Sequence, residues 1–249
     1  GVKVAATYDS ATGTLTPTVP LSEGAHTLAY TLTDAAGNES PKSPTLNVTI
    51  DTTAPATPAA PTSYADNVGS VTNASSTAAT TDDTTPGVNV GAGLTDTPSL
   101  YVDGVKVAAT YDSATGTLTP TVPLSEGAHT LAYTLTDAAG NESAKSPTLS
   151  VTIDTTTPAT PAVALATDSG SSATDKITNT STLNVTGLES VGTWEYSLDG
   201  TTWLAGTGST ITGITGDGAK SVRVRQTVTA VNISAASTTY AFTIDTTAP

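Results

Sequence analysis

The sequence predicts an all-β protein made of tandem antiparallel β-sandwich domains arranged end to end. Three observations predict this class: a long internal repeat, side chains that alternate with a period of two, and turn residues between the alternating segments. Across 129–136, His, Leu and Tyr side chains alternate with Thr and Ala, as in a half-buried strand. Pairs such as Asp103-Gly104 and Asp199-Gly200 supply turns. No segment keeps a helical period for three turns.

The internal repeat sets the size of the folding unit. Residues 1–51 match residues 104–154 at a constant offset of 103. The copies differ only in Pro41 against Ala144 and Asn47 against Ser150. A unit of about 100 residues has the length of one immunoglobulin-like sandwich.

A pentad of Asp-Thr-Thr-Ala/Thr-Pro closes each unit, at 51–55, 154–158 and 245–249. We therefore expect residues 1–55 to be the C-terminal half of a repeat, 56–158 a complete repeat, and 159–249 a complete but divergent one. Half a sandwich cannot cover its own sheet, so residues 1–51 should be the least stable part.

Composition narrows the class of function. The chain carries 22 acidic and 8 basic residues, a net charge of −14, and no cysteine. This acidity argues against a nucleic-acid partner and favours cations, and a metal could replace disulfides as a staple. No stretch approaches the ~20 apolar residues that span a bilayer, and no signal peptide opens the chain. We expect an internal fragment or export without an N-terminal signal, no membrane insertion, and a monomer.

Four short motifs resemble the repeated bacterial immunoglobulin-like domains of giant surface adhesins. They are the segments 81–86, 135–143, 151–156 and 194–200, which read TDDTTP, LTDAAGNES, VTIDTT and WEYSLDG. The resemblance implies an extracellular location on the bacterial cell surface, type I secretion, and Ca²⁺ at domain junctions. It also implies a role in attachment and biofilm formation. The partners would be neighbouring repeats of the same chain and a distal receptor bound by a region outside this sequence.

The first candidate cation site lies where consecutive repeats meet. Asp51 leaves the last strand of one repeat, and the next repeat brings Asp137 and Asn141 on one loop and Asp96 on another. Carboxylates from two domains would converge there, and irregular oxygen donors suit Ca²⁺ better than Mg²⁺. Asp154 begins the equivalent junction. The alternative is that these Asp and Asn residues only form turns, with Gly140 at a positive φ.

A second acidic cluster follows the first strand of the complete repeat. Asp66, Asp82 and Asp83 form it, and Asp168 and Asp175 are their counterparts in the third repeat by position. These residues form a second candidate Ca²⁺ site, with a solvated acidic turn as the alternative.

The third repeat departs from the junction pattern. Counting back from the final pentad places Asn232 at the position of Asn141, Val228 at that of Asp137, and Val231 at that of Gly140. Glu189 is a candidate substitute for the lost carboxylate. We expect weaker Ca²⁺ binding at the junction after Asp154 and more bending near residues 154–161.

The sequence holds no pattern for catalysis. It has no Cys nucleophile, phosphate loop, zinc spacing or plausible Ser-His-Asp set, and His26 and His129 occupy one structural position twice. The sequence therefore predicts a non-enzymatic spacer of a surface adhesin.

Two alternatives remain. One is a carbohydrate-binding module that uses Trp203 and Tyr196, with Trp194 or Trp203 as the core tryptophan. The other is an accessory Ig-like array of a secreted hydrolase. One short threonine row at Thr14, Thr16 and Thr18 falls far short of an ice-binding surface.

Overall fold

The computed structural model describes residues 1–69, 72–228, 230 and 232–248. Its regular elements are β-strands, and no α-helix occurs among the described residues. The predicted all-β class is confirmed. Small β-forming residues and frequent turn residues explain why the strands are short and numerous.

The chain divides into two compact units. The first comprises Gly1–Thr57, Thr95–Thr97 and Leu135–Ala144, and the second comprises Pro58–Leu94, Pro98–Thr134 and Lys145–Pro249. The repeat boundaries expected from the sequence stay a prediction. Residues 1–55, 56–158 and 159–249 are called the half repeat, the middle repeat and the third repeat below.

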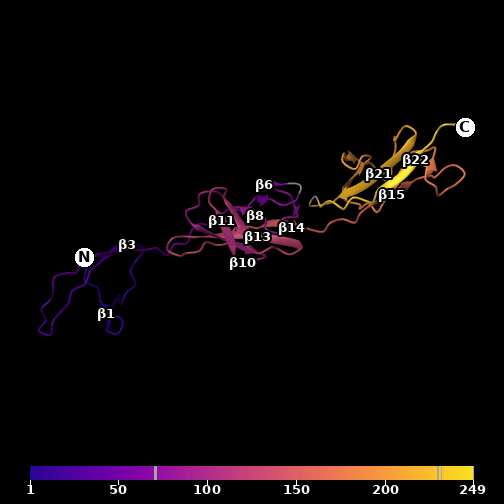
Figure 1. Ribbon diagram of the computed structural model, residues 1–249. Helices are drawn as coiled ribbons and strands as arrows, with labels where there is room; N and C mark the ends of the chain where they lie inside the picture. Colours follow the sequence, from indigo (N-terminus) through magenta and orange to yellow (C-terminus); the bar gives the residue numbers. More distant parts are fainter. Residues whose placement is uncertain (70–71, 229, 231, 249) are drawn as a thin grey trace. The chain divides into compact units, whose positions relative to one another are not determined.

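The middle repeat contains two five-stranded sheets (Figure 1). The first has the order β10 (Val105–Val107), β9 (Thr97–Val102), β13 (Gly127–Thr136), β14 (Leu149–Ile153), β7 (Thr80–Thr81). The second has the order β11 (Ala109–Asp112), β12 (Thr117–Pro120), β8 (Gly87–Asn89), β5 (Tyr64–Asp66), β6 (Asn73–Ser76). The short strand β7 joins β14 in parallel, whereas β13 and β14 are antiparallel.

The third repeat has a smaller and a larger sheet. The smaller has the order β15 (Ala162–Leu165), β17 (Leu183–Thr186), β20 (Thr210–Ile211). The larger has the order β16 (Ile177–Thr178), β22 (Tyr240–Ile244), β21 (Gly218–Thr227), β18 (Thr193–Ser197), β19 (Leu204–Ala205). Figure 1 shows β21 and β22 side by side, and they pair antiparallel.

The core of the third repeat lies between these two sheets. Leu183 and Ile211 from the smaller sheet join Val222, Val224 and Phe242 from the larger sheet in one buried cluster. Alternate residues of β21 point inward because successive side chains of a strand face opposite sides. This is the packing of a β-sandwich.

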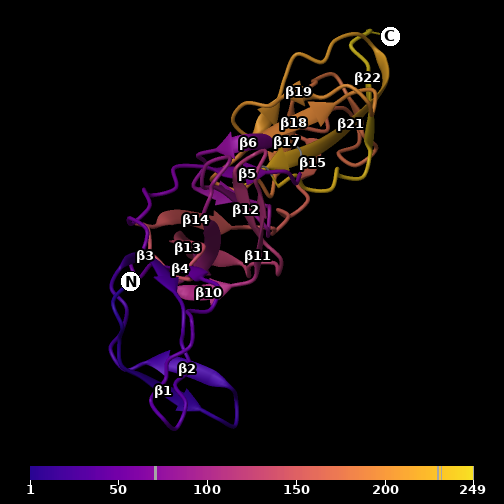
Figure 2. The same ribbon diagram turned by 90° about the vertical axis from the view of Figure 1, so that its left-hand side faces the viewer.

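The half repeat contains only two hairpin-like pairs, β1 (Ala6–Asp9) with β2 (Thr14–Pro17) and β3 (Gly24–Leu28) with β4 (Leu46–Ile50) (Figure 2). Their registers repeat those of the middle repeat, with Ala6 opposite Pro17 as Ala109 is opposite Pro120. The two near-identical sequences thus form these strand pairs with the same register.

The two copies differ in how deeply their equivalent side chains are buried. Leu15 is 50% exposed and Tyr30 is 54% exposed, whereas the identical positions Leu118 and Tyr133 are 1% and 6% exposed. The sequences around these residues are the same. The difference is therefore due to the strands that cover them in the middle repeat.

Two buried serines hold the loop that follows β13. The hydroxyl of Ser143 accepts the N–H of Leu135 at 3.0 Å, and the hydroxyl of Ser146 accepts the N–H of Tyr133 at 3.1 Å. The serine N–H groups donate to the carbonyls of the same two residues. These bonds extend the strand pairing and hold both ends of the segment 137–141.

An ion pair lies at the start of β13. His129 Nδ1 is 2.8 Å from Asp103 Oδ2, and Asp103 Oδ1 accepts the N–H of Thr130. The hydrogen bond to Asp103 raises the pKa of His129 above its ordinary value of 6.5. The bond from Thr130, followed by that from His129, lowers the pKa of Asp103. His26, in the half repeat, contacts the carbonyl of Ser22.

We predict that Leu118→Ala lowers the free energy of unfolding by about 2–5 kcal/mol, because it removes a fully buried side chain. The matched change Leu15→Ala, at the exposed copy, should change it by less than about 0.5 kcal/mol. Urea unfolding followed by circular dichroism measures both. Equal losses would contradict the difference in burial.

We predict that His129→Gln destabilises the protein more at pH 5.5 than at pH 8.5. A raised folded-state pKa gives stability that is complete below 6.5 and is lost as pH rises through the folded value. The effect should be below about 1 kcal/mol because the Asp103 side chain is half exposed. Thermal melts at both pH values, with His26→Gln as control, test this. A loss that does not depend on pH would contradict it.

Candidate functional site

The candidate site is the boundary between consecutive repeats. At the first boundary, the Asn141 side-chain amide donates to the backbone carbonyl of Asp51 at 3.0 Å. The same amide donates to Asp137 Oδ2 at 2.9 Å. Asn141 therefore connects the end of one repeat to a loop of the next.

Asp137 closes its own loop. Its Oδ1 accepts the N–H groups of Ala139 and Asn141, both at 2.9 Å, while Gly140 has a φ of 95°. The bonds from the Asn141 side chain and then its backbone lower the pKa of Asp137. A negative carboxylate thus stabilises the turn that presents Asn141.

The second boundary uses the same contact without the carboxylate. The Asn232 side-chain amide donates to the backbone carbonyl of Asp154 at 2.7 Å. The N–H of Val228 donates to the Asn232 carbonyl at 3.1 Å, as Asp137 does to Asn141. Val231 lies outside the described residues. The alignment of Asn232 with Asn141 was correct, and their shared role is a hydrogen bond to the preceding repeat.

Further contacts hold the segment that follows Asp154. Gln226 is 2% exposed, and its amide donates to the carbonyl of Ala159 at 2.7 Å. The N–H of Ala159 donates to Glu189 Oε1 at 3.3 Å, and Gln226 Oε1 accepts the N–H of Glu189. The sequence offered Glu189 as a candidate substitute for the lost carboxylate and gave no sign of Gln226. In the structure both residues bind the linker backbone, and the expected bending near 154–161 stays a prediction.

A carboxylate also binds each repeat exit, and sequence reasoning missed all three. Glu23, Glu126 and Asp217 accept the backbone N–H of the first threonine of the pentad, at 3.0, 2.8 and 3.1 Å. The spacing between acid and threonine is 29 residues in every case. This constant spacing was the signal available in the sequence.

Hydrogen bonds from the pentad stabilise the charged form of these three carboxylates. The threonine hydroxyl, ahead of the backbone N–H, lowers the pKa of Glu23, Glu126 and Asp217. Asp51 and Asp154 each use Oδ1 to accept the N–H two residues later, both at 3.1 Å. One carboxylate oxygen of each of these two predicted metal ligands therefore stabilises the turn that the residue begins.

In the second acidic cluster, the charges of Asp66 and Asp83 act on Asp82, but the three carboxylates do not form a metal site among the described residues. Thr81 Oγ1 donates to Asp66 Oδ2 at 2.8 Å, and burial, then the charges of Asp66 and Asp83, raise the pKa of Asp82. A side chain at Gly69 would place its Cβ 2.1 Å from Asp82 Oδ2 at a φ of 74°, so another residue there would displace the Asp82 carboxylate and strain the backbone.

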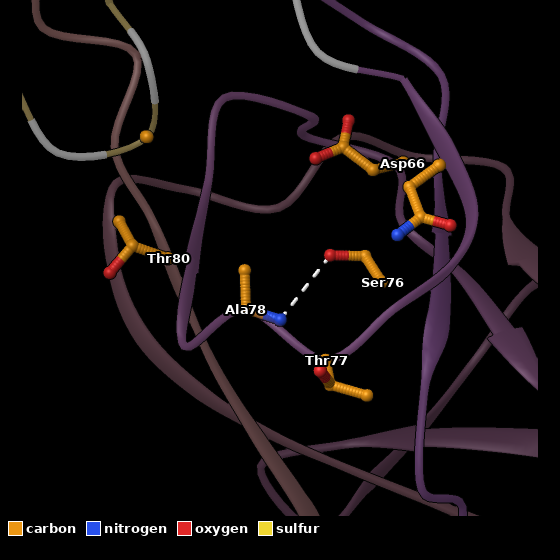
Figure 3. Close-up of a pocket in the computed structure, with 7 residues that line it drawn as sticks. Asp66, Ser76, Thr77, Ala78 and Thr80 are labelled. Atoms are coloured by element: carbon orange, nitrogen blue, oxygen red, sulfur yellow. Dashed lines mark hydrogen bonds between the residues drawn. The ribbon is translucent and has the colours of Figure 1, made fainter.

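Asp83 is fully buried but has hydrogen-bond partners. Its Oδ1 accepts the N–H of Thr85 at 2.8 Å, and its Oδ2 accepts that of Asn67 at 3.3 Å. Asp66 also lines an open hollow of about 360 Å³, with Ser76, Thr77, Ala78 and Thr80 around it (Figure 3). A dashed line in Figure 3 marks the 3.3 Å bond from the Ala78 N–H to Ser76.

The third repeat replaces most of this cluster. Thr178 pairs with β22 as Thr81 pairs with β14, so Asn179 and Thr180 stand where Asp82 and Asp83 do. Asp175 precedes that strand and accepts the N–H of Ile177. Asp168 accepts the N–H of Lys176, and its buried Oδ1 has no hydrogen-bond partner among the described residues.

The oxygen atoms at the first boundary are of the type that a hard cation prefers as ligands, because they belong to carboxylate and amide groups. They are few in number. The structure places Asp96 in the same compact unit as Asp51 and Asp137. Within the described ranges, however, no group of three or more His, Cys, Asp or Glu side chains could hold a metal ion. A bound Ca²⁺ would need backbone carbonyls and water to reach 6–8 ligands, and its presence stays a prediction.

Of three aromatic residues in the third repeat, Trp194 is buried, and Tyr196 and Trp203 are half-buried. Trp194 is 7% exposed, and its Nε1 donates to the carbonyl of Gly208. Its ring is tilted 42° to that of Tyr196. The guanidinium of Arg225 lies 4.1 Å from the Trp203 ring centroid and pairs with Glu195 at 2.8 Å. Trp194 is therefore the core tryptophan, and Trp203 is partly covered by Arg225.

Among the described residues, no helix is long and apolar enough to cross a membrane.

Comparisons with solved structures give distant likenesses. Fibronectin(III)-like modules of Clostridium thermocellum CbhA are 12% identical with a TM-score of 0.40, over 79% of this chain and 93% of theirs. A structure concerned with host cell surface retention of a 1.5-MDa bacterial ice-binding adhesin is 19% identical with a TM-score of 0.31, over 90% of this chain and 74% of its own. Likeness at this level carries no information about function.

A family comparison is more direct. No curated protein matches the chain. A family model described as a bacterial Ig-like domain matches residues 1–52 and 57–155, more than half of the sequence. Such domains are typically non-catalytic, and the match supports an extracellular Ig-like array. This match shows that the chain belongs to the bacterial Ig-like domain family.

Proposed function

We propose that this chain is a structural spacer of a bacterial cell-surface adhesin, without catalytic activity. Tandem repeats of this kind would carry a distal binding region away from the cell during attachment or biofilm formation. An acidic, cysteine-free chain of Ig-like repeats supports this role, because such a chain stays soluble and needs no disulfide chemistry. Export by type I secretion belongs to the same proposal.

One observation carries the proposal: the same side-chain contact recurs at two consecutive boundaries. Asn141 and Asn232 each donate to the carbonyl of the Asp that ends the preceding repeat. Linked domains move freely by default unless their linker or interface is held. A spacer needs restricted motion between consecutive repeats. The same hydrogen bond at both boundaries would restrict that motion.

Proline and side-chain contacts add to this restraint. Pro158 and Pro161 are buried beside the second boundary, and Gln226 holds the carbonyl between them. Proline restricts the backbone of a linker even when the linker is disordered, so less conformational entropy is lost when the linker becomes ordered.

Calcium is the cation that we propose for these boundaries. Asp51, Asp96, Asp137 and Asn141 would contribute oxygen ligands at the first, with waters completing the shell. Asp137 Oδ1 accepts two N–H groups, but Oδ2 accepts only the Asn141 amide and keeps a second lone pair for a cation. The second boundary, with Val228 in place of a carboxylate, would bind Ca²⁺ more weakly.

We predict that Asn141→Ala broadens the distance distribution between spin labels placed in the half and middle repeats. Removal of one neutral hydrogen bond costs about 0.5–1.5 kcal/mol, enough to loosen a boundary without unfolding a domain. The chain has no native cysteine, so single introduced cysteines can be labelled. Asn38→Ala, on the copy of this loop in the half repeat, is the matched control. Equal widths in the wild type and both variants would sink the proposed role of Asn141.

We predict that millimolar Ca²⁺ raises the melting temperature and that a chelator reverses the increase. Extracellular sites bind with Kd of about 10⁻⁴–10⁻³ M, and free Ca²⁺ at ~10 Kd adds roughly 1.4 kcal/mol per site. Asp137→Asn should reduce the increase, whereas Asp34→Asn, in the other copy of the loop, should not. A melting temperature that does not change with Ca²⁺ would contradict the proposed metal site. It would not affect the proposed role of the Asn141 hydrogen bond.

A further inference from the structure

The linker after Asp154 is held at one residue from two sides. The carbonyl of Ala159 accepts the Gln226 side-chain amide at 2.7 Å, and the N–H of Ala159 donates to Glu189 Oε1 at 3.3 Å. Both backbone polar groups of Ala159 are therefore bound by side chains of the third repeat. We call Gln226 and Glu189 the Ala159 clamp.

Gln226 is the main member of the clamp. It is 2% exposed, and its amide also donates to the carbonyl of Gly187 at 3.1 Å. Its Oε1 accepts the N–H of Glu189 at 2.8 Å. Glu189 is exposed, and its bond to Ala159 is the longest of the four. Release of the linker would leave buried polar groups of Gln226 unpaired, so opening of the clamp is unfavourable.

The clamp shortens the part of the linker that can move. On the side of the middle repeat, Glu126 binds the N–H of Thr155 at 2.8 Å. Only residues 156–158 lie between this held residue and Ala159, and Pro158 among them is buried. A linker of so few residues has little reach, and proline restricts its backbone further.

The first boundary has a leucine where the second has Gln226. Leu135 occupies the same position in its strand as Gln226. The N–H of each donates at 3.0 Å to a buried serine hydroxyl, that of Ser143 or of Ser234. Leucine has no polar group that can bind a carbonyl. Ala56, the alanine that follows the first pentad, therefore lacks the restraint that Gln226 provides.

The two boundaries also differ in loop charge. The first has Asp137 on the loop that presents Asn141, and the second has Val228 at that position. Gln226 is neutral, so its hydrogen bonds need no cation to offset a negative charge. Each boundary thus has one of two features, a loop carboxylate or a buried amide that binds the linker.

We propose that the Ala159 clamp holds the second boundary without a cation. The proposal rests on the spacer function proposed above and concerns its regulation. Removal of Ca²⁺ then leaves the second boundary unchanged, and any loosening occurs at the first. Residues 154–161 bend less than the loss of the loop carboxylate alone predicts.

Distance distributions between spin labels in the full chain test this proposal. Labels at Ser150→Cys and Ala241→Cys, both at exposed strand positions, report on the second boundary. We expect the same width in millimolar Ca²⁺ and in a chelator. Gln226→Leu, which introduces the residue found in the middle repeat, should broaden the distribution in both solutions. Broadening of the wild type by the chelator would overturn the proposal, as would equal widths in the wild type and Gln226→Leu.

Hydrogen exchange gives a second measurement that needs no label. The N–H of Glu189 is bound by Gln226 Oε1, so Gln226→Leu should speed its exchange on the order of 10-fold. Unchanged exchange would overturn the clamp. Trp194 lies opposite Gln226 in the sheet, and its fluorescence reports whether the variant is folded. The wild-type comparison in chelator decides the proposal even where Gln226→Leu does not fold.

Failure of the clamp and failure of the calcium proposal give different results. Labels at Ala25→Cys and Ser150→Cys report on the first boundary, and a width there that ignores the chelator contradicts the calcium proposal. The clamp fails when Gln226→Leu changes neither the width at the second boundary nor the exchange of Glu189.

Discussion

Burial of one apolar face of each sheet against the facing sheet holds every complete repeat together. Leu118 and Leu15 make this visible, because the same residue in the same local sequence is 1% exposed in one place and 50% exposed in the other. Backbone ordering carries an entropy cost of about 1–2 kcal/mol per residue, and local pairing alone rarely offsets it. The hairpins of the half repeat keep their register but lack the covering strands that stabilise their copies.

The boundary contacts depend on that core. Ser143 and Ser146 anchor the loop after β13 to the buried strand, and the loop then holds Asn141 in reach of the Asp51 carbonyl. The third repeat reproduces this arrangement with Ser234 and Asn232, although its loop has lost the carboxylate. The amide contact is therefore kept where the loop has lost its charge, and the loop carboxylate stabilises the turn at the first boundary only.

Three structural roles recur among the acidic residues outside the ion pairs of Asp103 and Glu195. Asp137 caps a loop, Glu126 binds the threonine at a repeat exit, and Asp66 belongs to a packed acidic cluster. Each role uses hydrogen bonds from backbone N–H or hydroxyl groups, which stabilise the negative charge without a metal. The high net charge of the chain is thus largely built into turns and exits, and Ca²⁺ binding would be an addition to this framework.

The sequence by itself determined the all-β class, the repeat, and the equivalence of Asn141 and Asn232, because side-chain alternation and near-identity are properties of neighbouring residues. Only the tertiary structure decided which groups these residues meet. The bond from Thr155 to Glu126 spans 29 residues, and that from Asn141 to Asp51 spans 90. The placement of Asn179 and Thr180 at the positions of Asp82 and Asp83 follows from the parallel register of β16 with β22. Such contacts depend on how distant strands align, and a shift of one residue would reverse the face of every side chain.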